Sequence, residues 1–195
     1  MTPLRLPDPP LRDERVVLRP WRIADLAVVE LASRDPAITV GTSVPVPYSE
    51  AAGDAWLARQ HAQREHRTGI SLAITDARSG QALGYVGVSG LVWRHLRGSL
   101  GYWVTGAQRG RGVATAAVGL LVPWTFSALG LVRVEAVVDV DNGGSQQVLA
   151  RNGFQPEGIL HAYYEMHGTW RDMVMFARLA DPSTPSTPAR PARHP

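Results

Sequence analysis

The 195-residue chain contains no cysteine and no lysine. Without cysteine it has no disulfide framework, thiolate zinc site, thiol nucleophile or thiol-based redox switch. Without lysine it lacks the Gly-Lys-Ser/Thr end of a P-loop. Apolar side chains make up 45% of the residues, and a chain of this size buries about 70% of its unfolded surface on folding. The composition therefore predicts one domain that folds around its own core.

All 20 basic residues are arginines, and the formal net charge is +3. Most of this surplus lies in the last 14 residues, because residues 1–181 hold 18 arginines against 17 acidic residues. A nearly neutral domain without a basic block lacks the electrostatic footprint of phosphate-backbone binding. We therefore expect no nucleic-acid partner, although a local cluster of arginines can still hold a small anion.

One stretch of 21 residues, 112–132, carries no charge and is long enough on count alone to cross a bilayer. Glycines, a proline and hydroxyl residues interrupt it, so we interpret it as a buried helix followed by the start of a strand. The Pro-rich start resembles neither a secretory nor a transit signal. We expect a cytoplasmic protein without a membrane span, with a domain over residues 12–181 between a flexible N-terminal segment (1–11) and a disordered Pro-rich tail (182–195).

The hydrophobic pattern switches several times between a period of two and a period near 3.6. It predicts strands around 14–21, 70–74, 83–91, 99–104, 133–140, 154–161 and 172–179, and helices around 23–33, from 50, 113–126 and 142–151. Three strands that follow one another in the middle favour antiparallel pairing, and a strand-helix-strand unit comes late. This mixed order indicates an α+β fold.

The most informative segment is 108–115, Gln-Arg-Gly-Arg-Gly-Val-Ala-Thr, between a predicted strand and the uncharged helix. Its glycines allow a ligand to approach the backbone, and the free N–H groups of a first helical turn point toward one spot. Arg109 and Arg111 add positive charge, so a diphosphate suits this position. A Rossmann fingerprint needs glycine where Thr115 stands. A plain glycine turn is the structural alternative.

These residues resemble the GNAT superfamily of N-acetyltransferases, whose acetyl-CoA motif is Gln/Arg-x-x-Gly-x-Gly/Ala. Arg109, Gly112 and Ala114 match that motif in order. The resemblance continues through the neighbouring segments 101–104, 133–136 and 142–154, covers most of residues 12–180, and is closest to the branch that acetylates ribosomal-protein N-terminal alanine or serine. It implies a single domain with a mixed, mostly antiparallel central sheet flanked by helices.

The resemblance also implies acetyl-CoA as co-substrate and no metal. The residues it assigns to the cofactor are Trp103 and Val104 for pantetheine, Arg109, Gly110, Arg111, Gly112, Val113, Ala114 and Thr115 for the pyrophosphate, and Asn142. Asn142 is equally well explained as the N-cap of the next helix, and one residue can do both. The six histidines are scattered without metal-ligand spacing, so we expect no metal site.

Acetyl transfer to an amine needs a neutral nucleophile, a donor for the developing oxyanion and a proton for the leaving thiolate. Glu135 interrupts an apolar strand and is the candidate base, with a surface position on a polar strand face as an equal alternative. Ser145 is the preferred candidate acid, followed by Tyr163 or Tyr164; capping and core packing are their alternatives. By resemblance, Trp56 is the candidate acceptor contact.

We therefore expect an acyltransferase that moves an acetyl group from acetyl-CoA to a primary amine by direct attack in a ternary complex. A protein or peptide N-terminal α-amine is the favoured acceptor, because an aminoglycoside site would need many carboxylates and the chain has 17 acidic residues. A small amine (aminoglycoside, polyamine or amino-acid derivative) and a catalytically weak CoA-binding regulatory module are the alternatives. Dimers are common in the family, so a homodimer is compatible with the sequence, although no interface can be located.

Overall fold

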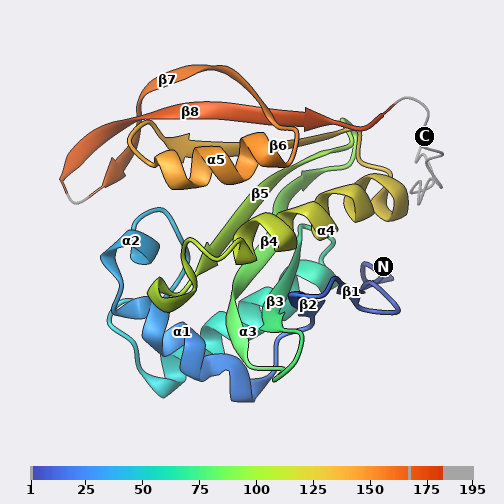
Figure 1. Cartoon of the computed structure of the whole chain (residues 1–195), viewed down its shortest axis with the longest axis vertical. Helices are drawn as coiled ribbons and strands as arrows, with labels where there is room; N and C mark the ends of the chain where they lie inside the picture. The colour runs from blue at the N-terminus through green and yellow to red at the C-terminus, as the bar shows by residue number, and fades with distance from the viewer. Residues whose placement is uncertain (1, 167, 182–195) are drawn as a thin grey trace.

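A computed structural model describes residues 2–166 and 168–181, and within them eight strands form one sheet in the order β1-β2-β3-β4-β5-β6-β8-β7 (Figure 1). Neighbouring strands are antiparallel except β5 and β6, which are parallel. The strands are β1 (Leu11–Arg12), β2 (Val16–Arg19), β3 (Ile70–Asp76), β4 (Ala82–Val92), β5 (Arg97–Val104), β6 (Arg133–Asp139), β7 (Gln155–Met166) and β8 (Thr169–Leu179). The expected α+β class is confirmed.

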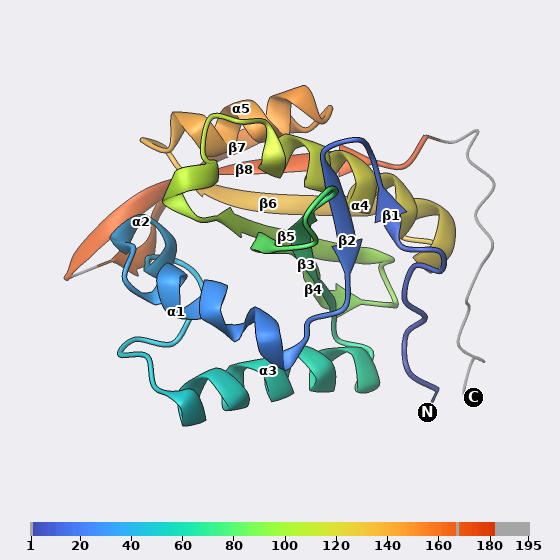
Figure 2. The same ribbon diagram turned by 60° about the horizontal axis from the view of Figure 1, so that its bottom comes forward.

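Helices cover both faces of this sheet, as Figure 2 shows. They are α1 (Leu26–Ser33), α2 (Pro36–Thr39), α3 (Glu50–Glu65), α4 (Val113–Leu129) and α5 (Gly143–Arg151), with short 3-10 turns η1 (Ile23–Asp25) and η2 (Gly106–Gln108). Alternate side chains of each strand face opposite layers. In β3, Leu72 and Ile74 pack into the core under α4, whereas Ala73 belongs to a second core under α1 and α3.

Two helices begin at the residues that the sequence predicts. The Ser49 hydroxyl accepts from the backbone N–H of Ala52 at 3.2 Å and caps α3. Asn142 Oδ1 accepts from the backbone N–H of Ser145 at 3.0 Å and caps α5. Both side chains satisfy an N–H group that has no partner inside its helix.

The uncharged helix α4 is clamped to α5 near its own start. The Asn152 side-chain amide donates to the carbonyl oxygens of Thr115 at 3.2 Å and Val148 at 2.8 Å. A Cβ atom at Gly119 would lie 3.0 Å from Asn152 Oδ1, so glycine leaves room for this clamp. The helix continues through Pro123. None of the helices in the described ranges is long and apolar enough to cross a membrane.

The N-terminal segment, which was expected to be flexible, packs against the rest of the domain. Leu4 is buried in the main core, its N–H donates to the Arg64 carbonyl oxygen at 3.2 Å, and Arg64 Nε donates back to the Leu4 carbonyl oxygen at 2.8 Å. Leu11 then begins β1, which pairs with β2. A Pro-rich stretch with few apolar residues gives no local signal for these contacts, because they depend on α3 and β2. The predicted tail, 182–195, lies outside the described residues.

Candidate active site

The sheet is splayed between its two parallel strands. β5 pairs with β6 only where residues 97–99 face residues 133–135, whereas β4 stays paired with β5 as far as Val104. From Leu100 to Val104, β5 therefore presents one edge of its backbone to a gap, and unpaired N–H and C=O groups at such an edge can bind another chain. Two cavities open from this gap.

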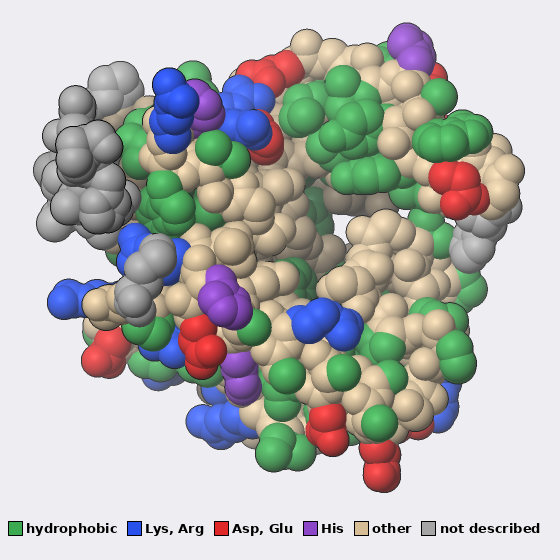
Figure 3. Space-filling model, turned by 180° about the vertical axis from the view of Figure 1, so that it is seen from behind, with side chains coloured by type: hydrophobic (Ala, Val, Ile, Leu, Met, Phe, Trp, Pro, Cys, Tyr) green, Lys and Arg blue, Asp and Glu red, His purple; other side chains and the backbone are tan. Residues whose placement is uncertain are grey.

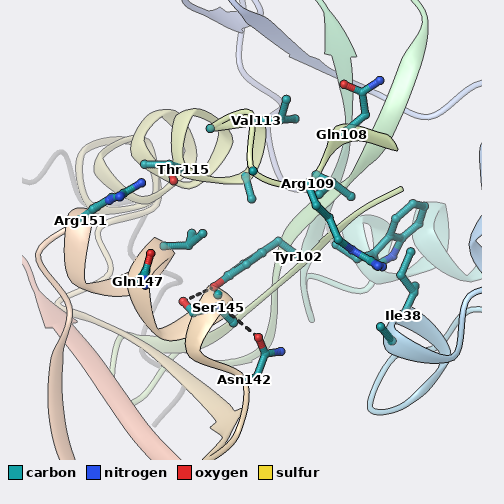
Figure 4. Close-up of a pocket in the computed structure, with 18 residues that line it drawn as sticks. Ile38, Tyr102, Gln108, Arg109, Val113, Thr115, Asn142, Ser145, Gln147 and Arg151 are labelled. Carbon is teal, nitrogen blue, oxygen red and sulfur yellow. Dashed lines mark hydrogen bonds between the residues drawn. The ribbon is translucent and has the colours of Figure 1, made fainter. Parts of the chain in front are cut away.

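The first cavity, of about 300 Å³, lies among the end of β5, the loop before α4 and the start of α5 (Figure 4). Its wall contains all the predicted cofactor residues except Arg111: Trp103, Val104, Arg109, Gly110, Gly112, Val113, Ala114, Thr115 and Asn142. Tyr102, Ser145, Gln147 and Arg151 also line it. The described residues of this wall include two arginines and no acidic side chain. The cavity therefore suits an anionic ligand.

The loop reaches α4 through two glycines with left-handed backbone angles. Gly110 has φ 72° and Gly112, the N-cap of α4, has φ 75°. A Cβ atom at Gly112 would also collide with Nη1 of Arg15, whereas one at Gly110 would meet no protein atom. The N–H groups of Val113 and the following first-turn residues point out of the helix with no acceptor four residues back. Together with the helix dipole they form a site for a negative group.

Arg109 connects the loop to the opposite side of the opening. Its Nη2 donates to Asp35 Oδ2 at 2.5 Å. Asp35 also caps α2 by accepting from the N–H of Ala37 at 3.0 Å. This ion pair links α2 to the loop and neutralises much of the charge of Arg109. Arg151 lies at the other end of the cavity, beside Thr115 (Figure 4).

A partly buried tyrosine that the sequence analysis did not single out, Tyr102, lies at the gap. The Tyr102 hydroxyl is 2.6 Å from Ser145 Oγ and donates to the Ser145 carbonyl oxygen at 3.1 Å. Burial raises the pKa of Tyr102 to about 12, and its hydrogen bond with Ser145 offsets this only in part. The phenol therefore keeps its proton at neutral pH. The sequence feature that could have identified Tyr102 is the alternation of side chains along β5, which places Tyr102 on the same face as Leu100.

The second cavity, of about 430 Å³, lies on the far side of the same residues. It shares Ala37, Tyr102, Trp103, Asn142 and Ser145 with the first cavity, then extends to residues 40–43 and to the β7–β8 hairpin. A Cβ atom at Gly41 would lie 3.5 Å from Met166 Cε, so the hairpin touches the loop after α2. Figure 3 shows the hollow from behind, between the hairpin above and the rest of the sheet below.

One carboxylate reaches into the second cavity. Asp139, the last residue of β6, accepts from Arg171 Nε at 2.9 Å and Nη2 at 3.1 Å, and from the backbone N–H of Asp141 at 2.8 Å. The hydrogen bonds from Arg171 hold the pKa of Asp139 below its usual value. Asp141 also pairs with Arg171. Among the described residues that line either cavity, Asp139 is the only acidic one.

Residues 15–155 match the model of the acetyltransferase (GNAT) domain family. The chain belongs to the GNAT family. The N-acetyltransferase YoaA of Bacillus subtilis, described as uncharacterized, is 33% identical over 113 residues, 58% of this chain and 64% of that protein. The ribosomal-protein-serine acetyltransferase of Escherichia coli is 25% identical over 116 residues, 60% of this chain and 65% of the relative. Both alignments span less than two thirds of the relatives' own length.

Solved GNAT structures share the whole fold. Mycobacterium smegmatis RimJ, in complex with CoA-disulfide, superimposes with a TM-score of 0.79 at 29% identity, over 91% of this chain and 88% of that one. The expected single-domain GNAT architecture, a mostly antiparallel sheet flanked by helices, is confirmed.

Glu135, the candidate base, lies in an ion-pair network and not in the described wall of either cavity. Its Oε1 accepts from Arg97 Nη1 at 2.5 Å and its Oε2 from Arg133 Nε at 3.0 Å, and Arg133 also binds Glu157 through two hydrogen bonds. These contacts lie at the closed end of the gap, where β5 and β6 still pair. Glu135 is absent from the described walls of both cavities, so its geometry supports the ion-pair alternative and gives no support to proton transfer.

Trp56 also lies away from the GNAT site. Only 1% of its surface is exposed, its ring packs edge-on against Trp21 at 4.9 Å between centroids, and neither described cavity wall includes it. The structure therefore makes Trp56 a core residue instead of the expected acceptor contact. Tyr85, stacked on Trp103 at 6.2 Å, lines the second cavity.

Of the two candidate tyrosines, Tyr164 lines the second cavity and is absent from the described wall of the first. It lies on β7 against Tyr163, at 4.8 Å between ring centroids. Burial, with a smaller effect of Tyr163, raises the pKa of Tyr164. A group of three metal-ligating side chains is also absent from the described part of the chain.

Proposed function

We propose that the chain is an acetyl-CoA-dependent N-acetyltransferase, in which the first cavity binds the CoA moiety and the second receives the acceptor amine. The observation that carries this proposal is the junction of the two cavities at Tyr102 and Ser145. Transfer between two bound molecules requires two sites that meet at one point, and holding the reactants there can supply much of the rate.

The residues of the first cavity fit CoA. Two glycines and the free amides of α4 suit a pyrophosphate, and the wall carries Arg109 and Arg151 without an acid. The open backbone edge of β5 from Leu100 to Val104 suits the amide groups of pantetheine. Acetyl-CoA supplies an activated acetyl thioester when it is bound.

With the two substrates bound in this way, the Tyr102–Ser145 pair lies where negative charge develops on the CoA sulfur as the acetyl group leaves it. Because Tyr102 stays protonated, its hydrogen bonds with Ser145 keep a hydroxyl donor available at the junction. Asn142 fixes the backbone of Ser145 by capping α5. We infer that these residues orient the donor group, while the second cavity aligns the amine for direct attack.

For the acceptor we favour the N-terminal α-amine of a protein or peptide. The likeness to the ribosomal-protein-serine acetyltransferase of Escherichia coli supports this. So does a second cavity of about 430 Å³ whose described wall holds a single acid, since a polycation would call for several. A small amine acceptor and a CoA-binding regulatory module are the competing functions. The cytoplasmic location stays a prediction of the sequence, and a homodimer stays compatible with the resemblance to the family.

The test combines calorimetry of CoA binding with an acetyl-CoA turnover screen. The screen offers short peptides beginning with serine or alanine, their N-terminally blocked counterparts, polyamines and aminoglycosides. We expect turnover on free peptide N-termini and none on the blocked peptides. Turnover on polyamines or aminoglycosides alone would establish the small-amine alternative. CoA binding without turnover would establish the regulatory module, and loss of both would overturn the enzyme assignment.

A further inference from the structure

The two cavities have opposite charge character. The described wall of the first contains Arg151, Arg109 (which pairs with Asp35 outside the wall) and no acid, and that of the second contains Asp139 and neither arginine nor histidine. Arg171, which binds Asp139, is absent from the described part of both walls. An anion is therefore favoured on one side of the junction and a cation on the other.

The carboxylate of Asp139 is held in a fixed position. Its side chain is 18% exposed, Oδ1 accepts from Arg171 Nη2 and the N–H of Asp141, and Oδ2 accepts from Arg171 Nε. Arg171 is shared with Asp141, so one guanidinium faces two carboxylates and the cluster keeps a net negative charge.

The surroundings of Asp139 within the cavity strengthen its attraction for a cation. Val138, Met166 and Met173 supply apolar wall beside it. A charge interaction is stronger next to apolar surface than in open water. Asp139 lies at the end of β6, a short distance along the chain from Asn142 and Ser145, which line both cavities.

We propose that Asp139 is a positioning residue that binds the acceptor in its ammonium form and places it beside the Tyr102–Ser145 junction, with Arg171 fixing the carboxylate. This inference rests on the proposed function and adds how the amine is recognised. A free α-amine has a pKa of about 7.7–8.0 and is largely protonated at neutral pH. The ammonium gives up its proton to water before attack, so Asp139 acts mainly on acceptor affinity.

The chain offers a matched pair of variants. Asp139→Asn removes the charge inside the cavity, and Asp141→Asn removes a charge from the same arginine at a side chain that is 77% exposed and outside the described cavity wall. For Asp139→Asn we expect KM for a peptide acceptor to rise at least about tenfold, with kcat within about threefold and acetyl-CoA affinity unchanged. For Asp141→Asn, which removes an exposed charge of the same cluster, we expect KM for the peptide acceptor to rise by less than about threefold, with kcat and acetyl-CoA affinity unchanged. Equal effects of the two variants, or a loss confined to kcat, would overturn the inference.

A second measurement makes its main comparison in the wild-type protein alone. Binding to the wild-type protein with CoA present is compared by calorimetry for two unreactive peptides, one beginning with trimethylglycyl and the other with the neutral isostere 3,3-dimethylbutanoyl. We expect the cationic peptide to bind at least about tenfold more tightly, and the difference to disappear in Asp139→Asn. Equal affinities in the wild-type protein would overturn the inference even where turnover stands, whereas absent CoA binding and absent turnover would overturn the proposed function.

Discussion

The Tyr102 hydroxyl lies 2.6 Å from Ser145 Oγ, across the gap between β5 and the start of α5. This contact forms part of the wall that the two cavities share. It is made by a residue of the splayed strand and a residue of the helix that follows β6, so the splay of the sheet and the capping of α5 together create it.

Tyr102→Phe and Ser145→Ala should each lower kcat by about 10- to 100-fold, because a hydrogen bond to a charged group contributes about 1.5–3 kcal/mol. The double variant should have a kcat only slightly below that of the less active single variant, since the two hydroxyls act as one unit. Tyr163→Phe, which changes a tyrosine outside the described cavity walls, is the control and should keep full turnover. Acetyl-CoA affinity should stay within about twofold for all of them.

The pKa of Tyr102, about 12, adds a pH signature to this experiment. Since the phenol ionises only far above neutral pH, kcat should show no decline from this group between about pH 6 and pH 10. A fall in kcat within that range that disappears in Tyr102→Phe would contradict the assignment. So would unchanged turnover in both single variants.

Gly112→Ala and Gly110→Ala separate backbone strain from a steric clash. Both glycines have positive φ, so alanine at either position costs roughly 1–2 kcal/mol. Only the Cβ atom at residue 112 also collides with Arg15. We expect both variants to lower the melting temperature by a few degrees and by similar amounts, because the Arg15 guanidinium is the end of a flexible side chain and can move aside; Gly112→Ala, at the N-cap of α4, should also weaken acetyl-CoA binding. A markedly lower melting temperature for Gly112→Ala would show that Arg15 is held in place.

The parts of the site that the sequence predicts are those with local signals. The glycines of the loop, the cap at Asn142 and the hydroxyl of Ser145 all depend on a few neighbouring residues, and the structure brings them to one cavity. The helix starts at Ser49 and Asn142 follow from the same kind of local chemistry. The splay between β5 and β6 has no such signal, because it depends on which strands pair and for how long.

The residues that sequence reasoning misplaced or missed depend on partners distant in the chain. Glu135 is surrounded by arginines of two strands, and Trp56 is covered by Trp21 from the segment before α1. Asp139 owes its position to Arg171, 32 residues later. Alternation identifies the face of a strand on which a charge lies, but only the pairing of β6 with β8 decides whether that face meets an arginine or a cavity.

Glu135→Gln tests the ion-pair role directly. Because Arg97 and Arg133 would lose their shared carboxylate, the free energy of unfolding should fall by roughly 1–2 kcal/mol, as measured by urea denaturation. Turnover should stay within about twofold of the wild-type value, since the side chain is outside the described walls of both cavities. Glu157→Gln, which removes the outer acid of the same network, is the matched control and should cost less because that side chain is more exposed. A large loss of kcat in folded Glu135→Gln protein would restore the general-base assignment.

Protonation of Asp25 should lower the stability of the fold in acid. It is 6% exposed and accepts from Arg19 Nη1 at 2.7 Å, Arg19 Nη2 at 2.8 Å and the N–H of Arg22 at 2.8 Å. Burial acts to raise the pKa of Asp25, but the hydrogen bonds from Arg19 and Arg22 outweigh it, so the pKa lies below 3.8. Because the folded-state pKa is lowered, this contribution to stability is present above about pH 4 and is lost as the pH falls through the folded-state pKa.

Asp25→Asn should therefore lower the free energy of unfolding at pH 7 by about 3 kcal/mol, since it leaves a largely buried arginine without its partner. The difference from the wild-type protein should shrink as the pH falls below about 4 and through the lowered folded-state pKa of Asp25. Urea denaturation at several pH values checks this. Asp54→Asn, at an exposed position of α3 with no ion pair among the described residues, is the control and should follow the wild-type curve. A difference between Asp25→Asn and the wild-type protein that is the same at every pH would show that Asp25 contributes through packing instead of through its charge.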